Sequence, residues 1–281
     1  MPTAIPWTDE TWNPWQGCTK ISCGCRECYM YREKISYGQD PTKVIRSSKT
    51  VFDKPFRLKP GTAVFTCSWS DFFHIDADAW RREAWSIIRL CNDLLFIILT
   101  KRPERIAANL PEDWGNGYSN VIMGITAEDQ GWFNLRWPIL QHITAAGYLI
   151  SHEPAYGGII YPDSFLSLRD RAWVIAGGES GNNAYPSHLY WFRQDRDQCN
   201  LNGVPFFFKA WGEWVHGLYV DGCYQLQNNQ WSSGKNSSVY KWPGGGVSVR
   251  IGREVSGEKL DGKIHHEFPN IRLKPSQTSI F

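Results

Sequence analysis

Short apolar runs alternate with longer amphipathic segments between residues 62 and 211, a pattern typical of repeated strand–helix units. The apolar runs are rich in β-branched and aromatic residues and predict six strands: Thr62–Cys67, Leu94–Leu99, Val121–Ile125, Tyr148–Ser151, Ala172–Ala176 and Val204–Phe208. The amphipathic segments predict three helices: Asp78–Cys91, Glu128–Thr144 and Ser187–Leu201, with Ser187 as the N-cap of the last. Strands that alternate with helices form parallel sheets, so the pattern predicts an α/β fold.

The pattern changes after residue 211. Residues 212–281 consist of short alternating segments separated by Asn228-Asn229, Ser232-Ser233 and Gly244-Gly245-Gly246, which predict hairpins. No repeat of fixed period appears, and a chain of 281 residues is long enough for an α/β barrel to form one domain. We therefore predict a barrel over residues 1–211 and a small β-rich C-terminal extension, packed on the barrel, over residues 212–281.

A polar segment follows each predicted strand. These segments are Ser68-Trp69-Ser70-Asp71, Thr100-Lys101-Arg102, Thr126-Ala127-Glu128, His152-Glu153, Gly177-Gly178-Glu179-Ser180-Gly181 and Lys209-Ala210-Trp211. The carboxyl ends of the strands of a barrel share one rim, and active sites of such barrels form at that rim. A single polar strand end is equally well explained as a helix cap or a surface ion pair. Six together predict a functional site.

Four cysteines fall within residues 18–28: Cys18, Cys23, Cys25 and Cys28. Thiolates this close in sequence cannot all form disulfides without strain, but they can converge on one iron–sulfur cluster or one zinc ion. The other four cysteines stand alone, so the second pair of ligands that structural zinc sites normally have is missing. The spacing favours an iron–sulfur cluster. A compact zinc site, or cysteines with a purely structural role, remain the alternatives.

Composition limits the classes of protein to be considered. A hydrophobic fraction of 42% and a charged fraction of 21% are typical of soluble globular proteins, and no apolar run reaches the roughly 18 residues of a membrane span. The N-terminus lacks the features of a signal peptide, so we expect a cytoplasmic protein with reduced thiols. The net charge of +2 does not by itself predict nucleic-acid binding, although residues 43–59 are rich in lysine and arginine.

Tryptophan is unusually frequent, with fifteen residues. Trp80, Trp85 and Trp137 have the spacing of core positions on helices. Six others lie beside polar motif residues: Trp7, Trp12, Trp15, Trp69, Trp211 and Trp214. Packing is the commoner role of such residues, and stacking on a base or an adenine ring is the functional alternative.

Several blocks of the chain together resemble a family of phage-encoded radical S-adenosylmethionine (SAM) proteins with a C-x6-C-x2-C motif. The blocks are Trp7-Thr8-Asp9, Trp12-Asn13-Pro14, Gly17-Cys18-Thr19-Lys20, Cys28-Tyr29, residues 68–74, residues 99–105, Glu153-Pro154, residues 177–181, residues 204–209 with Trp211-Gly212, Leu260-Asp261-Gly262 and Glu267-Phe268-Pro269. They extend over essentially the whole chain. Within this family, the chain resembles the N-alpha-glycyl-thymidine DNA isomerases of thymidine hypermodification.

The resemblance implies a partial (β/α)6 radical SAM barrel, with the cluster loop, residues 18–28, after its first strand. Cys18, Cys25 and Cys28 would be the ligands of a 4Fe-4S cluster. Cys23 departs from the family pattern, which has another residue at this position, and is a spare thiol, an alternative ligand or a resolving group. The implied SAM-binding residues are Ser68, Ser70 and Asp71 for the methionine amino group, Lys101 or Arg102 for the carboxylate, and Thr126 or Glu128 for the ribose.

The resemblance also implies a substrate and a reaction. Glu153, Glu179 and Lys209 would meet the substrate, and His74 and His152 are candidate proton carriers. In the implied reaction, a 5′-deoxyadenosyl radical takes hydrogen from the α-carbon of a glycine linked through nitrogen to the thymine methyl carbon, and the link then moves to the α-carbon. The expected partners are this modified thymidine, in DNA or as a nucleotide, and an electron donor such as flavodoxin or ferredoxin, with no membrane involved. A radical SAM lyase or repair enzyme would share these features, and a zinc-bound nucleic-acid-binding module is the non-enzymatic alternative.

Overall fold

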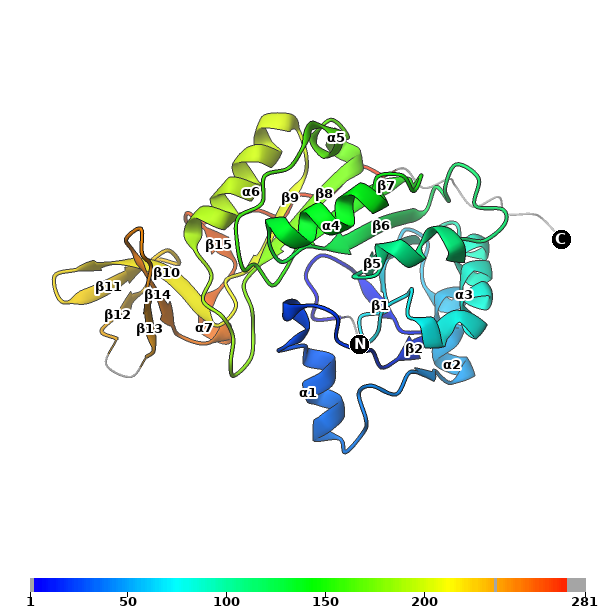
Figure 1. Cartoon of the computed structure of the whole chain (residues 1–281), viewed down its shortest axis with the longest axis horizontal. Coiled ribbons are helices and arrows are strands. Elements are labelled where there is room, and N and C mark those ends of the chain that lie inside the picture. Colours follow the sequence, from blue (N-terminus) through cyan, green and yellow to red (C-terminus); the bar gives the residue numbers. More distant parts are fainter. Residues whose placement is uncertain (1–2, 235–236, 272–281) are drawn as a thin grey trace.

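The core of the molecule is a curled sheet of seven parallel strands, shown in Figure 1 as a computed structural model that describes residues 3–234 and 237–271. The strands are β1 (Glu10–Trp12), β4 (Ala63–Thr66), β5 (Leu95–Thr100), β6 (Val121–Thr126), β7 (Gly147–His152), β8 (Ala172–Gly177) and β9 (Phe206–Ala210). They lie side by side in this order, and every neighbouring pair is parallel. Each crossover therefore advances the sheet by one strand, which produces a half-barrel.

Helices and short turns connect the strands. The α-helices are α1 (Tyr29–Ser36), α2 (Lys49–Phe52), α3 (Asp78–Leu90), α4 (Gln130–Leu140), α5 (Asp163–Leu166), α6 (Leu189–Asn202) and α7 (Arg253–Ser256). The 3-10 turns are Cys23–Cys25, Lys54–Arg57, Ile75–Ala77, Pro103–Arg105, Ala107–Asn109 and Arg169–Arg171. Two short strands, β2 (Trp15–Gln16) and β3 (Ile45–Arg46), form a separate antiparallel pair.

Alternate residues of the strands face two separate apolar layers. In β6, Met123 packs with the helices in the larger layer, whereas Ile122 lies in a smaller layer on the concave side of the sheet with Leu149 and Trp173. Trp7 from the N-terminal segment closes this smaller layer. Because both faces are covered, the strands are apolar almost throughout and their polar residues are confined to their ends.

The predicted α/β class and all six predicted strands are confirmed, with each strand end within two residues of its predicted position. The strand β1 was not among them. It has three residues, Glu10–Trp12, and pairs with β4 on one side only. A run this short carries no recognisable period in the sequence.

Two of the three predicted helices need correction. The helix expected over Glu128–Thr144 covers only Gln130–Leu140, because Asp129 caps it by accepting a hydrogen bond from the Trp132 backbone N–H at 2.9 Å. The N-cap of α6 is His188, whose ring nitrogen Nδ1 accepts from the Tyr190 backbone N–H at 3.1 Å. The prediction of Ser187 as this N-cap is therefore wrong, and the Ser187 side chain is instead buried one residue before the N-cap.

The chain after the barrel forms a five-stranded antiparallel sheet. In spatial order its strands are β12 (Trp231–Ser232), β11 (Cys223–Leu226), β10 (Trp214–Val220), β14 (Val247–Arg250) and β13 (Val239–Lys241). A small hairpin follows, formed by β15 (Lys259–Leu260) and β16 (Lys263–Ile264). The chain then returns to the edge of the barrel, where the Phe208 backbone N–H donates to the His265 carbonyl at 2.8 Å. Residues 272–281 of the predicted extension lie outside the described residues.

Most of the tryptophans considered for base stacking are core residues. Trp12, Trp15 and Trp211 are completely buried, and Trp7 and Trp214 nearly so. A ring enclosed by protein cannot stack on a base, so the stacking alternative is wrong for these five. Trp69 is half-buried.

His216 on β10 is expected to make stability depend on pH. Burial, followed by the charges of His188 and Arg193, lowers its pKa from 6.5 to about 4. The unfolded chain therefore binds the proton more tightly than the folded chain, and a fall in pH from 6.5 to 4 should remove about 3 kcal/mol of the free energy of unfolding through this group. Urea unfolding of His216→Gln should show a correspondingly smaller loss over this pH interval. Identical pH profiles for the two proteins would contradict this expectation.

Among the described residues, every helix is too short or too polar to cross a membrane.

Candidate functional site

The cysteine loop lies between β2 and α1. Cys18, Cys25 and Cys28 are half-buried and Cys23 is exposed, and all are free thiols. The Tyr31 hydroxyl donates to the Cys18 carbonyl at 2.5 Å, and burial followed by the charges of Cys18, Cys28 and Cys25 raises the pKa of its phenol. Burial and the contact with Glu179 raise the pKa of Tyr156, and the charge of Cys23 adds to this effect.

The base of the cysteine loop is fixed to the segment that follows β4. The Gly17 backbone N–H donates to the Trp69 carbonyl at 2.9 Å, and the Ser70 hydroxyl donates to the Gly17 carbonyl at 2.6 Å. The Ser68 hydroxyl accepts a hydrogen bond from the Asn13 amide at 3.0 Å. Ser68 and Ser70, which we predicted to bind SAM, therefore hold the entry to the cysteine loop in this structure.

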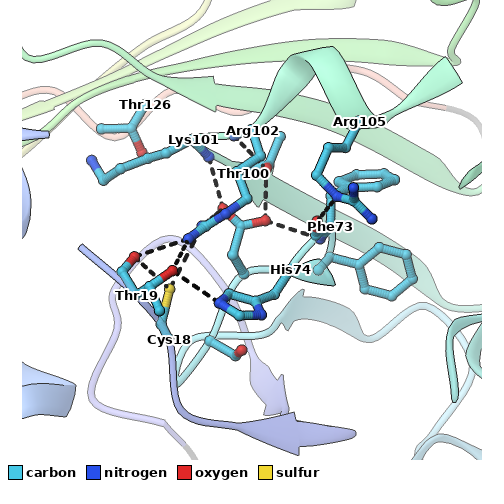
Figure 2. A network of polar contacts seen from close by, with 12 residues as sticks. Cys18, Thr19, Phe73, His74, Thr100, Lys101, Arg102, Arg105 and Thr126 are labelled. Carbon is cyan, nitrogen blue, oxygen red and sulfur yellow. Dashed lines mark hydrogen bonds and ion pairs between the residues drawn. The ribbon is translucent and has the colours of Figure 1, made fainter. Parts of the chain in front are cut away.

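Asp71 is a buried carboxylate, and its partners Phe73, Thr100, Lys101 and Arg102 are labelled in Figure 2. Its Oδ1 accepts from the Phe73 backbone N–H at 2.9 Å and from the Thr100 hydroxyl at 2.7 Å. Its Oδ2 accepts from the Lys101 backbone N–H and from Arg102 Nη1, both at 3.0 Å. Four donors thus surround one carboxylate, which ties the segment after β4 to the end of β5.

Arg102 connects this carboxylate to the first cysteine. The guanidinium is buried, and Nη1 donates to Cys18 Sγ at 3.6 Å while Nη2 donates to the carbonyl and hydroxyl oxygens of Thr19, each at 2.9 Å. The Thr19 hydroxyl also hydrogen-bonds His74 Nε2 at 3.0 Å. Burial and then Asp71 raise the pKa of Cys18 to about 12, although Arg102 acts in the opposite direction. A cation that donates to a sulfur stabilises the thiolate form that binds metals.

Glu128 is a second buried carboxylate that contacts the loop. Its Oε1 accepts from the Ser22 hydroxyl at 2.5 Å and from Lys101 Nζ at 2.7 Å, and its Oε2 accepts from Arg136 Nη1 at 2.8 Å. Burial acts to raise the pKa of Glu128, but Lys101 and Arg136 outweigh it and hold the pKa below its usual range. Gly24 lies directly against this carboxylate, because a Cβ at that position would be 2.4 Å from Oε1.

Glu179 binds the far side of the loop. Its Oε2 accepts from Arg26 Nη2 at 3.0 Å and from the Tyr185 backbone N–H at 2.7 Å, and its Oε1 accepts from the Tyr156 hydroxyl. The carboxylate is buried, whereas the Arg26 side chain is 52% exposed. Residues 178–185 thus join the cysteine loop to the C-terminal half of the barrel.

Glu153 and Lys209 form an ion pair that is open to solvent. Their Oε1 and Nζ atoms are 2.5 Å apart, and the two side chains are 23% and 30% exposed. Unlike Asp71, Glu128 and Glu179, this carboxylate has one hydrogen-bonding side chain among the described residues, namely Lys209. The pair lies at the ends of β7 and β9 and retains the capacity to bind a ligand with charges of both signs.

A family model described as a protein of unknown function (DUF5131) matches residues 2–269. The chain belongs to the DUF5131 family. Neither the curated proteins nor the solved structures contain a match to it.

For this DUF5131 chain, the structure brings most of the sequence-predicted site residues to one end of the sheet. Lys101 and Glu128 are bonded to each other there, and Thr126 is buried at the end of β6, where its carbonyl accepts from Arg136 at 2.8 Å. His152 is the last residue of β7, but its ring is completely buried against α6, where Nδ1 is 2.6 Å from Asp195 Oδ2. The prediction of His152 as a proton carrier at the rim therefore has no geometric support.

Several residues of the site were not predicted from the sequence: Thr19, Ser22, Gly24, Arg26, Arg136 and Tyr156. The glycine between Cys23 and Cys25 was the one available signal, because a glycine inside a ligand loop can mark a close approach to another group. The others are ordinary residue types, and only their distant partners give them a role.

Within residues 3–234 and 237–271, no three His, Cys, Asp or Glu side chains are gathered closely enough to hold an ion. The cysteine loop nevertheless provides the donor set of a soft metal centre. Cys18, Cys25 and Cys28 are free thiols on one loop, and Arg102 donates to the Cys18 sulfur at 3.6 Å. These residue types fit an iron–sulfur cluster bound through three thiolates.

Proposed function

We propose that the protein is a radical SAM enzyme in which Cys18, Cys25 and Cys28 hold a 4Fe-4S cluster. The observation that carries the proposal is the position of three thiols on one loop at the carboxyl end of a seven-stranded parallel half-barrel. When bound, the cluster would supply the electron that cleaves SAM to a 5′-deoxyadenosyl radical. Because the thiols are not gathered as they stand, we expect their side chains to turn toward one another on cluster binding.

The surrounding residues would fix the loop and exclude water. Arg102 would favour the thiolate of Cys18, and Asp71 would hold Arg102 in place. The side chain of Lys101 is 19% exposed, and we assign its ammonium group to the SAM carboxylate. Ser68, Ser70 and Asp71 remain the assignment for the amino group, and Thr126 and Glu128 the assignment for the ribose. Each of these five residues would contact SAM in addition to its present partners.

The proposed substrate is a thymidine with a glycine linked through nitrogen to its methyl carbon, and the proposed reaction is an isomerisation. One hydrogen would leave the α-carbon, the thymine methyl carbon would move from the nitrogen to that α-carbon, and the hydrogen would return to the nitrogen to form the second N–H bond of a primary amine. All atoms of the substrate are therefore conserved. The glycine carries a carboxylate and an amine, and the open ion pair offers Lys209 for the first and Glu153 for the second. Glu179, which is buried, would position Arg26 and Tyr156 beside the substrate.

SAM cleavage tests the proposed enzyme class. The protein would be purified without oxygen, reconstituted with iron and sulfide and reduced with dithionite, flavodoxin or ferredoxin, and 5′-deoxyadenosine would be measured. We expect cleavage by the wild type and none by the triple variant Cys18→Ala, Cys25→Ala, Cys28→Ala. Cys23→Ala is the matched control in the same loop and should keep both iron and cleavage. Bound zinc with no cleavage by the wild type would refute the proposal and support a non-enzymatic module.

Product mass tests the reaction. A DNA oligonucleotide that contains the N-linked glycyl-thymidine would be incubated with active enzyme, and the nucleosides would be separated after digestion. An isomerase yields a new nucleoside of unchanged mass, whereas a lyase or repair enzyme yields products of lower mass. Lys209→Ala, which removes the proposed carboxylate-binding cation, should lower turnover of this substrate while SAM cleavage in its absence persists.

A further inference from the structure

A continuous row of aromatic rings, which we call the aromatic track, runs from Glu179 onto the C-terminal sheet. It consists of Tyr156, Tyr185, Tyr240 and Trp242. The ring centroids of successive members are 5.8, 6.2 and 4.7 Å apart. The Tyr156 hydroxyl donates to Glu179, so the track begins at the candidate active site.

The rings of the track differ from those of the core in exposure and in orientation. Tyr185 is 38% exposed and the other three members are half-buried, whereas core rings such as Trp12 and Phe72 are completely buried. Successive rings meet at interplanar angles of 84°, 53° and 67°. None of the three pairs is stacked face to face, so the exposed surface of these rings includes ring faces on which flat groups can stack.

Two arginines that are at least partly exposed lie along the track. Arg26 lies at its beginning, and Arg250 contacts the segment that carries Tyr185 by donating to the Gly181 and Asn182 carbonyls. The half-buried carboxylate of Glu27 accepts from the Asn183 amide in the same segment. The carboxylates of Glu179 and Glu213 in this region are mostly buried. The segment between β8 and α6 that carries Tyr185 lies between α1 and the C-terminal sheet, as Figure 1 shows.

The lysine- and arginine-rich stretch of residues 43–59 offers less free charge than its composition indicates. Arg46, Lys49 and Lys54 are paired with Glu83, Asp53 and Glu10. Arg26 and Arg250 of the aromatic track are also paired with carboxylates, so the difference lies in the rings. Residues 43–59 contain two phenylalanines, of which Phe52 is completely buried, and the aromatic track is therefore the better candidate for stacking on bases.

The geometry points to the aromatic track as the binding surface for a single strand of DNA, whose bases stack on the rings while its phosphates face Arg26 and Arg250. Alternating stacking rings and cations are the features with which proteins bind single strands without reading their sequence. This inference rests on the proposed function, because it takes thymidine within DNA as the substrate. In this inference the protein binds the DNA strand and not a free nucleotide, and this binding brings the reacting base to Glu179.

Binding of a fluorescein-labelled oligodeoxythymidylate of about 12 nucleotides tests the inference by fluorescence anisotropy at fixed salt. The full-length protein, purified without oxygen, should bind the probe. The double variant Tyr185→Ala, Tyr240→Ala should bind at least about tenfold more weakly, because two stacking platforms are lost. Tyr185→Phe, Tyr240→Phe keeps the rings, removes the hydrogen bond between the two hydroxyls and should bind like the wild type.

The control is a second tyrosine pair on the same sheet, Tyr219 and Tyr224, with centroids 5.1 Å apart. In the strand register, Tyr240 lies opposite Ser248 and His216, and residues 216 and 219 of β10 point to opposite faces. Tyr219→Ala, Tyr224→Ala should therefore leave binding unchanged. The inference is overturned if the wild type does not bind the probe, if both alanine pairs weaken binding equally, or if an oligouridylate of the same length binds more tightly.

The SAM assay, run without DNA on the same preparations, separates this inference from the proposed function. Cleavage of SAM without binding of the oligonucleotide would refute the aromatic track and leave the enzyme class standing. Binding of the oligonucleotide that depends on the aromatic track, without cleavage of SAM, would refute the enzyme class and leave the aromatic track standing.

Discussion

Replacement of Asp71 by alanine is expected to lower the free energy of unfolding by about 3–5 kcal/mol, the usual cost of removing one partner of a buried ion pair. Arg102 would be left as a buried cation without its carboxylate, and the Thr100 hydroxyl and the Phe73 and Lys101 backbone N–H groups would lose their acceptor. We expect the melting temperature of the apoprotein, measured by circular dichroism, to fall by roughly 10 °C.

The Asp71 substitution should also weaken the attachment of the cysteine loop. Arg102 holds Cys18 and Thr19 through three hydrogen bonds and is itself held by Asp71, so the iron content after reconstitution should fall as well. Asp53→Ala is the control, because Asp53 pairs with an exposed lysine, Lys49, and such pairs contribute at most about 1 kcal/mol. Equal destabilisation by the two substitutions would show that Asp71 does not act through Arg102.

Replacement of Gly24 by alanine is expected to displace the cysteine loop. The added Cβ would lie 2.4 Å from Glu128 Oε1 and 2.6 Å from its Cγ. This carboxylate cannot move aside without cost, because it is fully buried and accepts hydrogen bonds from Ser22, Lys101 and Arg136. Overpacking of this kind costs about 1–3 kcal/mol. Because Glu128 is held in place, we expect the cysteine loop to move.

Iron content and SAM cleavage of the reconstituted Gly24→Ala variant measure this displacement, and we expect both to be largely lost while the fold is retained. Gly244→Ala is the matched control, because no atom lies within 4 Å of the added Cβ and the backbone there is not left-handed. Normal iron content in Gly24→Ala would mean that the contact between the loop and Glu128 has no part in cluster binding.

Much of the barrel was predictable because strands buried on both faces leave a direct trace in the sequence. Continuous apolar runs such as Val121–Thr126 and Ala172–Gly177 are recognisable without any partner. The end of α4 was harder to predict, since apolar and polar residues continue past Leu140 in a helix-compatible pattern. The helix cap at His188 required knowledge of where a side chain points, which a run of polar residues does not provide.

The sequence by itself determined that six strand ends are polar and that a cysteine-rich loop precedes them, because burial and ligand spacing are local properties of the chain. Only the tertiary structure decided what each polar residue contacts. Asp71 and Arg102 are 31 positions apart, and Arg26 and Glu179 are 153 positions apart. The open Glu153–Lys209 pair and the aromatic track likewise exist only because folding brings distant residues together. Hydrogen bonds and ring contacts depend on distances of a few ångströms in space, and separation along the chain does not specify these distances.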